Sequence, residues 1–168
     1  MKMKERSVMM DNFDFIQMKV PAKPEYVGVI RLTISGIASR MGFNYEDIED
    51  LKVAVSEAAT NVVSHAYENK EYGELTLGYG VHDDRLEVMV SDQGESFNYE
   101  EVKERIGPVT ETEKVSPIEE IREGGFGLFL INTLMDKVQI NNKYGVVVFM
   151  TKYLDETEVN MDEQIRTT

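Results

Sequence analysis

The stretch DIEDLKVAVSEAATNVVSHAY, residues 47–67, decides how the rest of the chain is interpreted. Its apolar residues recur at intervals of three and four, so they fall within an arc of about 80° on a helix. Asn44 stands just before the stretch and is a good N-cap, and Glu46 and Asp47 suit the positive end of a helix dipole. We therefore predict a helix from residue 45 to about residue 67 with one buried face.

Three polar residues follow one another along this helix at intervals of four: Glu57, Asn61 and His65. At about 100° per residue they share one face, which borders the apolar arc. A carboxylate and an amide in that position need partners, because a buried polar group without one costs a few kcal/mol. Two interpretations stay open: a ligand site, or a solvated helix edge with His65 packed against a sheet.

The rest of the chain supplies strands and two further helices around this one. We predict strands at residues 13–20, 74–81, 85–91, 137–141 and 146–153, and helices at residues 25–41 and 126–135 with Gly42 as the C-cap of the first. The long polar stretch at residues 93–123 is typical of a lid or binding loop, or of a partly disordered segment. Paired hairpins favour an α+β two-layer sandwich, with a mixed, mostly antiparallel sheet and helices on one face.

We expect a single domain over residues 10–154. A disordered or non-native extension at residues 1–9 precedes it, and an acidic tail at residues 155–168 follows it.

The composition excludes several classes of function. The chain has 168 residues, a formal charge of −13, no cysteine and two histidines. The negative charge repels the phosphates of nucleic acids and acidic membranes, which disfavours direct binding to either. Disulfides, zinc–thiolate sites and thiol catalysis all require cysteine and are excluded. No apolar run approaches the roughly 20 residues of a membrane-spanning helix, so we expect a cytoplasmic protein.

Two further stretches carry residues that suit a nucleotide. Asp92 ends a predicted strand and Gly94 follows it closely; this pattern is typical of an Asx-turn, but also of a carboxylate that accepts a hydrogen bond from a heterocycle's amino group. Residues 124–128 read GGFGL and open a predicted helix. Backbone amides at a helix N-terminus bind phosphate, although such a run can also be a flexible hinge.

Together, the three stretches resemble the GHKL (Bergerat-fold) ATP-binding superfamily. They are SEAATNVVSHAY (56–67), SDQG (91–94) and REGGFGL (122–128), in the order of that superfamily. Within it, the chain is most similar to the small anti-sigma-factor serine kinases that control sigma-B, the general-stress sigma factor of Gram-positive bacteria. Segments 20–43, 47–67, 84–97 and 134–140 carry this closer likeness.

The resemblance implies a role for each matching residue. Asn61 would supply an oxygen ligand to Mg²⁺ on the ATP phosphates, and Glu57 would act as general base toward an incoming hydroxyl. Asp92 would accept from the adenine amino group, with Gly94 leaving room for the purine. The remaining matches are Gly125 and Gly127 for the phosphates, Arg122 as a clamp on the γ-phosphate, Thr60 in the pocket wall and His65 as a structural prop.

The function that the resemblance implies is that of an enzyme and a switch. Such a protein sequesters a sigma factor from RNA polymerase and uses Mg-ATP to phosphorylate a serine on its anti-anti-sigma antagonist, which inactivates the antagonist. The family also implies a homodimer. The alternative is a nucleotide-gated binding module with little or no kinase activity; Glu57 argues against it, because binding alone needs no carboxylate one turn from the metal ligand.

Overall fold

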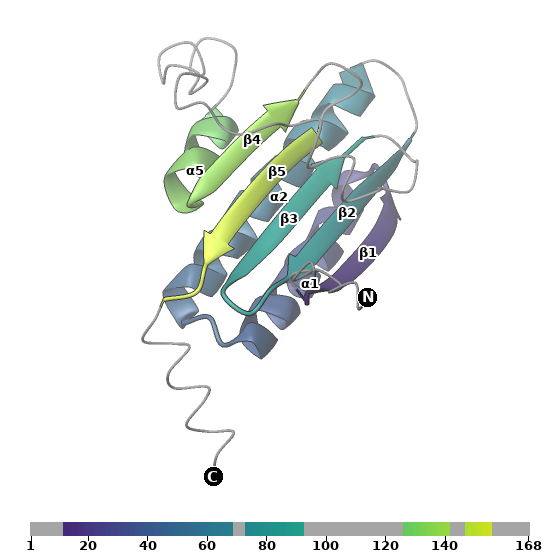
Figure 1. Cartoon of the computed structure of the whole chain (residues 1–168). Helices are drawn as coiled ribbons and strands as arrows, with labels where there is room; N and C mark the ends of the chain where they lie inside the picture. The colour runs from purple at the N-terminus through teal and green to yellow at the C-terminus, as the bar shows by residue number, and fades with distance from the viewer. Residues whose placement is uncertain (1–11, 69–72, 93–125, 142–146, 156–168) are drawn as a thin grey trace, which may run out of the picture.

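A computed structural model of the chain describes residues 12–68, 73–92, 126–141 and 147–155 (Figure 1). Side chains are described for these residues except 65–68, 126, 128 and 141. The elements in chain order are β1 (Asp14–Pro21), a 3₁₀ turn (Pro24–Tyr26), α1 (Val27–Met41), α2 (Tyr45–Glu68), β2 (Glu74–Val81), β3 (Arg85–Ser91), α5 (Phe126–Leu134), β4 (Lys137–Asn141) and β5 (Val147–Tyr153). Each predicted strand and helix is confirmed to within two or three residues.

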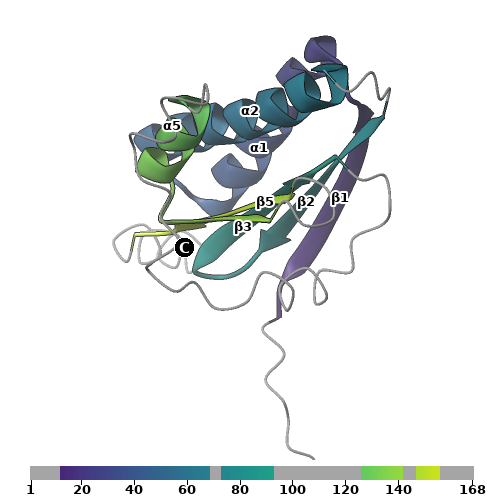
Figure 2. The ribbon, with the colours of Figure 1, turned by 90° about the horizontal axis from the view of Figure 1, so that it is seen from above.

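The five strands form one sheet in the order β1-β2-β3-β5-β4. Every strand pairing among the described residues is antiparallel. Figure 2 shows α1, α2 and α5 together on one side of this sheet. The predicted two-layer α+β sandwich is therefore confirmed. The sheet was predicted to be mixed and mostly antiparallel, and its described strands are all antiparallel.

Helix boundaries follow from capping residues that the sequence makes visible. Gly42 has φ 92°, a left-handed conformation that glycine adopts without steric cost, and it ends α1 as predicted. The Phe43 amide then donates to the Ala38 carbonyl at 3.2 Å. At the start of α2, the Asp47 amide donates to Oδ1 of Asn44 at 2.8 Å, which confirms the N-cap. These caps fix where α2 begins and hence where its polar stripe lies.

The main core lies between the helices and the inner face of the sheet. Residues on α2 that are fully buried there cover about half of the helix circumference rather than the predicted arc of about 80°. The additional buried positions are Ala54, Ala59 and Val63. The wider burial arises because α2 packs against α1, α5 and the sheet at once. This central position makes α2 the scaffold on which the candidate site is built.

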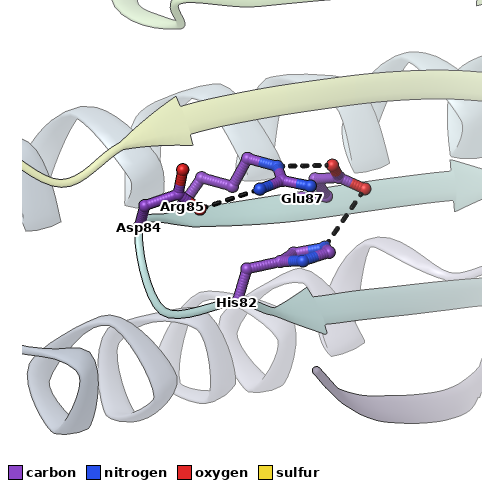
Figure 3. Close-up of polar contacts among 4 residues, drawn as sticks. All are labelled: His82, Asp84, Arg85 and Glu87. Carbon is purple, nitrogen blue, oxygen red and sulfur yellow. Dashed lines mark hydrogen bonds and ion pairs between the residues drawn. The ribbon is translucent and has the colours of Figure 1, made fainter. Parts of the chain in front are cut away.

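The outer face of the sheet carries a second, smaller cluster, in which Met89 and Phe149 are buried against Phe13 and Phe15. Beside it, at the β2–β3 hairpin, Glu87 is buried and its carboxylate lies 2.9 Å from Arg85 Nε and 3.5 Å from His82 Nε2 (Figure 3).

The predicted turn at residues 82–84 is confirmed by the 3.0 Å hydrogen bond from the His82 amide to the Arg85 carbonyl. The His82 side chain is buried rather than exposed on that turn, and its ring stacks on Phe13 with centroids 4.5 Å apart. Across the described part of the chain, none of the helices has the length and apolar character needed to cross a membrane.

Candidate functional site

Helix α2 holds the two central residues of the site. Glu57 and Asn61 lie one helical turn apart and are both half-buried, next to the fully buried Ala58 and Val62. The confirmed N-cap and the apolar burial fix the rotation of α2, so both polar side chains lie at the margin of the core. Thr60, predicted to line the same pocket, is exposed. Glu57 and Asn61 are thus only partly solvated, and the interpretation of the polar stripe as a ligand site stays a prediction.

Gly127, in the first turn of α5, lies directly against these two side chains. It is buried, and a Cβ placed on it would lie 2.9 Å from Oε2 of Glu57, 3.2 Å from Nδ2 of Asn61 and 3.4 Å from its Oδ1. Only a glycine lets the backbone approach so closely without displacing the carboxylate. The first and third stretches of the sequence pattern, far apart along the chain, are therefore brought into contact.

The N-terminal end of α5 lies beside the Glu57 side chain. Phe126 begins α5, so Gly127 lies in the turn whose backbone amides have no partner within the helix. That end of a helix carries a positive partial charge, which stabilises a nearby anion. The same amides suit the phosphate groups of a nucleotide. The structure thus places an acidic side chain, an amide side chain and a helix N-terminus together.

Asp92 follows the last residue of β3, as predicted, and is half-buried. β3 lies in the middle of the sheet, and α2 packs over it. The end of β3 pairs with the start of β2, Ser91 opposite Thr76, and the chain passes from the C-terminal end of α2 into β2. Asp92 therefore lies at the end of the sheet toward which α2 runs.

Several predicted site residues lie outside the described part of the chain. They are Gly94, Arg122 and Gly125, together with the lid at residues 93–123, and the side chain of His65 is also not described. Their roles stay predictions. The sequence analysis also missed one buried residue, Lys152 on β5. The sequence signal that could have revealed it is its alternation with Val148 and Met150, which places it on the inner face of the sheet.

Comparison with known families agrees with this fold. A family model described as a histidine kinase-like ATPase domain matches residues 20–152, which is most of the chain. This is the class of protein that the two-layer fold and the α2–α5 contact define. The chain therefore belongs to the histidine kinase-like ATPase domain family and is an ATP-binding protein.

Individual relatives narrow the class. The chain is 61% identical over 160 residues to the serine-protein kinase RsbW of Oceanobacillus iheyensis, which covers 95% of this chain and 99% of that protein. It is 52% identical over 158 residues to the serine-protein kinase RsbW of Bacillus subtilis, with 94% and 97% covered. A crystal structure of the RsbU and RsbW domains of a Mycobacterium tuberculosis protein has a TM-score of 0.57 and 17% identity. It covers 83% of this chain and 32% of that chain, and shows the fold alone.

These identities over nearly the full length place the chain within the RsbW serine-protein kinases. The resemblance to the small anti-sigma-factor serine kinases is confirmed, and so is the prediction of an ATP-dependent protein-serine kinase. The alternative of a binding module with little or no kinase activity loses its support.

Proposed function

We propose that this kinase carries out phosphoryl transfer at the contact between Glu57, Asn61 and Gly127, and that its substrate is a serine on the antagonist of a sigma factor. The single observation that supports this site is the approach of Gly127 to both α2 side chains, so close that a Cβ added to the glycine would lie 2.9 Å from Oε2 of Glu57. It joins a carboxylate, a side-chain amide and a helix N-terminus in one place, and these groups can serve as proton acceptor, metal ligand and phosphate-binding site in phosphoryl transfer.

The nucleotide would extend from the N-terminus of α5, which would hold its phosphates, to the end of β3, which would hold its adenine. Gly127 and Gly125, through the amides of the α5 N-terminus, would hold the phosphates, and Arg122 would clamp the γ-phosphate. Asp92 would accept a hydrogen bond from the adenine amino group, with Gly94 leaving room for the ring. Thr60, which is exposed on α2, would line the edge of the pocket.

The residues present fit a magnesium ion on the phosphates. Mg²⁺ prefers oxygen ligands and is usually shared between one or two protein oxygens and the nucleotide. Asn61 offers such an oxygen, and its Oδ1 would lie 3.4 Å from a Cβ placed on Gly127. The Glu57 carboxylate adds negative charge beside it. When bound, the ion would neutralise charge on the phosphate oxygens, a need that is acute in a chain of formal charge −13.

Glu57 is the residue we assign to proton transfer. A serine hydroxyl of the substrate attacks the γ-phosphorus, and its proton passes to the Glu57 carboxylate as the new oxygen–phosphorus bond forms. The bond between the γ-phosphorus and the β–γ bridging oxygen breaks, and ADP leaves with the electron pair. The close approach of Gly127 at the start of α5 would hold the Glu57 carboxylate in one orientation for this step.

The partners follow from the family rather than from the geometry. We propose that the protein holds a sigma-B-type sigma factor away from RNA polymerase, and that phosphorylation inactivates the antagonist that would otherwise release it. Both partners act on transcription, which supports a cytoplasmic location. The resemblance also supports a homodimer, which sedimentation of the purified protein at micromolar concentration tests directly.

Substituting Glu57 by glutamine tests the site. The amide keeps the shape of the side chain but cannot take the proton, so we expect phosphoryl transfer to fall by about a hundredfold or more. ATP binding, measured by calorimetry with Mg²⁺, should stay near that of the unmodified protein. The matched control is Glu46→Gln, an exposed carboxylate in the first turn of the same helix, which should leave transfer unchanged. Undiminished transfer in Glu57→Gln would remove Glu57 from the proposed role.

A further inference from the structure

A buried lysine lies between the two helices that build the site. Lys152 is only 8% exposed, and its Nζ donates to the carbonyl oxygen of Leu134 at 2.7 Å. The same nitrogen lies 3.7 Å from Oδ1 of Asp47 and 3.7 Å from Oδ2 of Asp50. One ammonium group thus contacts three groups that are distant from it in the sequence.

These contacts join the ends of two helices. Leu134 is the last residue of α5, where carbonyl groups lack partners within the helix and a cation is stabilised by the helix dipole. Asp47 and Asp50 lie in the first two turns of α2. Lys152, fixed on β5 by pairing with Leu86 on β3, therefore connects the C-terminal end of α5 to the N-terminal end of α2.

The same two helices meet at the catalytic end of the site. Asp50 and Glu57 are seven residues apart on α2, and Gly127 and Leu134 are seven residues apart on α5. Seven residues of α-helix span about 10.5 Å, so the distance along α2 from Glu57 to Asp50 equals the distance along α5 from Gly127 to Leu134. The lysine contact and the glycine contact are thus the two ends of one α2–α5 interface, and a shift of α5 at one end moves it at the other.

We propose that Lys152 is a positioning residue for phosphoryl transfer: it fixes the register of α5 on α2, and so holds Gly127 against Glu57 and Asn61. α5 has nine residues, which is too short to be positioned by its own hydrogen bonds. Lys152 contacts Leu134, Asp47 and Asp50, at the opposite end of the α2–α5 interface from the proposed reacting groups. The inference rests on the proposed function, because it assumes that transfer takes place at the Glu57–Gly127 contact.

The charge of Lys152 can be removed without leaving a deeply buried charge behind. The side chains of Asp47 and Asp50 are 21% and 28% exposed, so water still reaches both carboxylates. Methionine fills the space of the lysine stem and carries no charge. Lys152→Met is therefore expected to fold, with its effect concentrated on the position of α5.

The test compares three variants by the rate of phosphoryl transfer and by affinity for ADP. For Lys152→Met we expect kcat to fall by about tenfold, since a displacement near 1 Å at a catalytic contact has effects of that order or larger. ADP affinity should change less than kcat, because the proposed adenine contact at Asp92 follows β3 and only the phosphates of ADP meet α5. Lys152→Arg retains the charge and should recover kcat to within about threefold. Lys137→Met, on an exposed lysine of β4, is the matched control and should behave as the unmodified protein.

Hydrogen exchange separates positioning from general destabilisation. In Lys152→Met the amides of α5 should exchange faster while those of β2 and β3 stay protected, because only one interface is loosened. The proposal is overturned if Lys152→Met keeps its kcat, or if Lys152→Arg loses as much kcat as Lys152→Met. Should Lys152→Met not fold, Asp50→Asn decides in its place: a reduced kcat supports the proposal and an unchanged one overturns it. Failure of the catalytic assignment is distinguishable, because it appears as undiminished transfer in Glu57→Gln.

Discussion

Two clusters of buried charge differ in what they connect. On the outer face of the sheet, Glu87 is 4% exposed and is paired with Arg85 at 2.9 Å and with His82 at 3.5 Å. All three belong to one hairpin and lie within six positions of one another (Figure 3). On the inner face, Lys152 is similarly buried, but its partners come from the distant ends of α2 and α5.

Because of this difference, we expect the hairpin cluster to contribute to stability and the lysine cluster to contribute to function. The hairpin cluster joins two strands that a continuous backbone ladder already holds together, so it adds to stability without setting the position of any site residue. The lysine cluster joins elements that no ladder connects, so it sets tertiary geometry. We expect disruption of the α2–α5 interface to appear mainly in kcat, and disruption of the hairpin cluster to appear mainly in the free energy of unfolding.

The largest effect is expected at the glycine end of the α2–α5 interface. In Gly127→Ala the new methyl group would lie 2.9 Å from Oε2 of Glu57, and the carboxylate must move to make room. Because the obstructed atom is the end of a flexible side chain, the fold should survive while kcat falls by roughly tenfold to a hundredfold. Initial rates at saturating ATP measure the loss.

Gly36→Ala is the control for this change, because a Cβ at that exposed position of α1 meets no atom within 4 Å. It should keep its kcat and gain about 0.5–1 kcal/mol of stability, as alanine does in a helix interior. A Gly127→Ala protein with full activity would show that the close approach has no role in transfer. It would also contradict the expectation that disruption of the α2–α5 interface lowers kcat.

The intermediate effect is expected in the hairpin cluster. Glu87→Gln removes the charge that faces Arg85 and His82, and should lower the free energy of unfolding by about 1–2 kcal/mol because a charged hydrogen bond is lost in a buried place. Urea unfolding measures this change. kcat measured on the folded protein should not change. Glu74→Gln, an exposed carboxylate at the start of β2, should alter neither quantity. A fall in kcat for Glu87→Gln, measured where the protein is fully folded, would contradict the separation.

Most of the fold could be predicted from local sequence signals. Helix periodicity, the Asn44 and Gly42 caps and the turn at residues 82–84 each depend on a few neighbouring residues, and the structure confirms all of them. The placement of Glu57 and Asn61 on one face of α2 is equally local. These predictions succeeded because helix geometry alone determines them.

The contacts that position the site could not be predicted in the same way. The approach of Gly127 to Glu57 depends on how α5 packs on α2, and that packing is set by the whole core. Lys152 was visible as an inner-face strand position, but nothing in the sequence shows which helix ends would surround it. His82 was placed on a turn, and its burial against Phe13 arises from the pairing of β1 with β2, which are separated by two helices. The resemblance to a family indicated which residues belong to the candidate site, whereas their arrangement in space required the tertiary structure.

The smallest effect is expected at a buried polar group that carries no charge and serves as a reference for both clusters. Tyr79 is fully buried on β2, its hydroxyl donates to Sδ of Met18 at 3.3 Å, and burial raises its pKa far above the ordinary value. Near pH 7, Tyr79→Phe should change the free energy of unfolding by less than about 1 kcal/mol, because a hydrogen bond to sulfur is weak and the ring still fills its space.

The raised pKa gives Tyr79 a signature in alkaline solution. The native state holds the proton more tightly than the unfolded state, so the contribution of this group is fully present below the unfolded pKa of about 10 and is lost as pH rises beyond it. Between pH 9 and 11 the unmodified protein should therefore lose more stability than Tyr79→Phe. Parallel urea titrations across that range measure the difference. Coincident curves for the unmodified protein and Tyr79→Phe would show that the phenol ionises as readily in the native state as in the unfolded state, and would contradict the raised pKa.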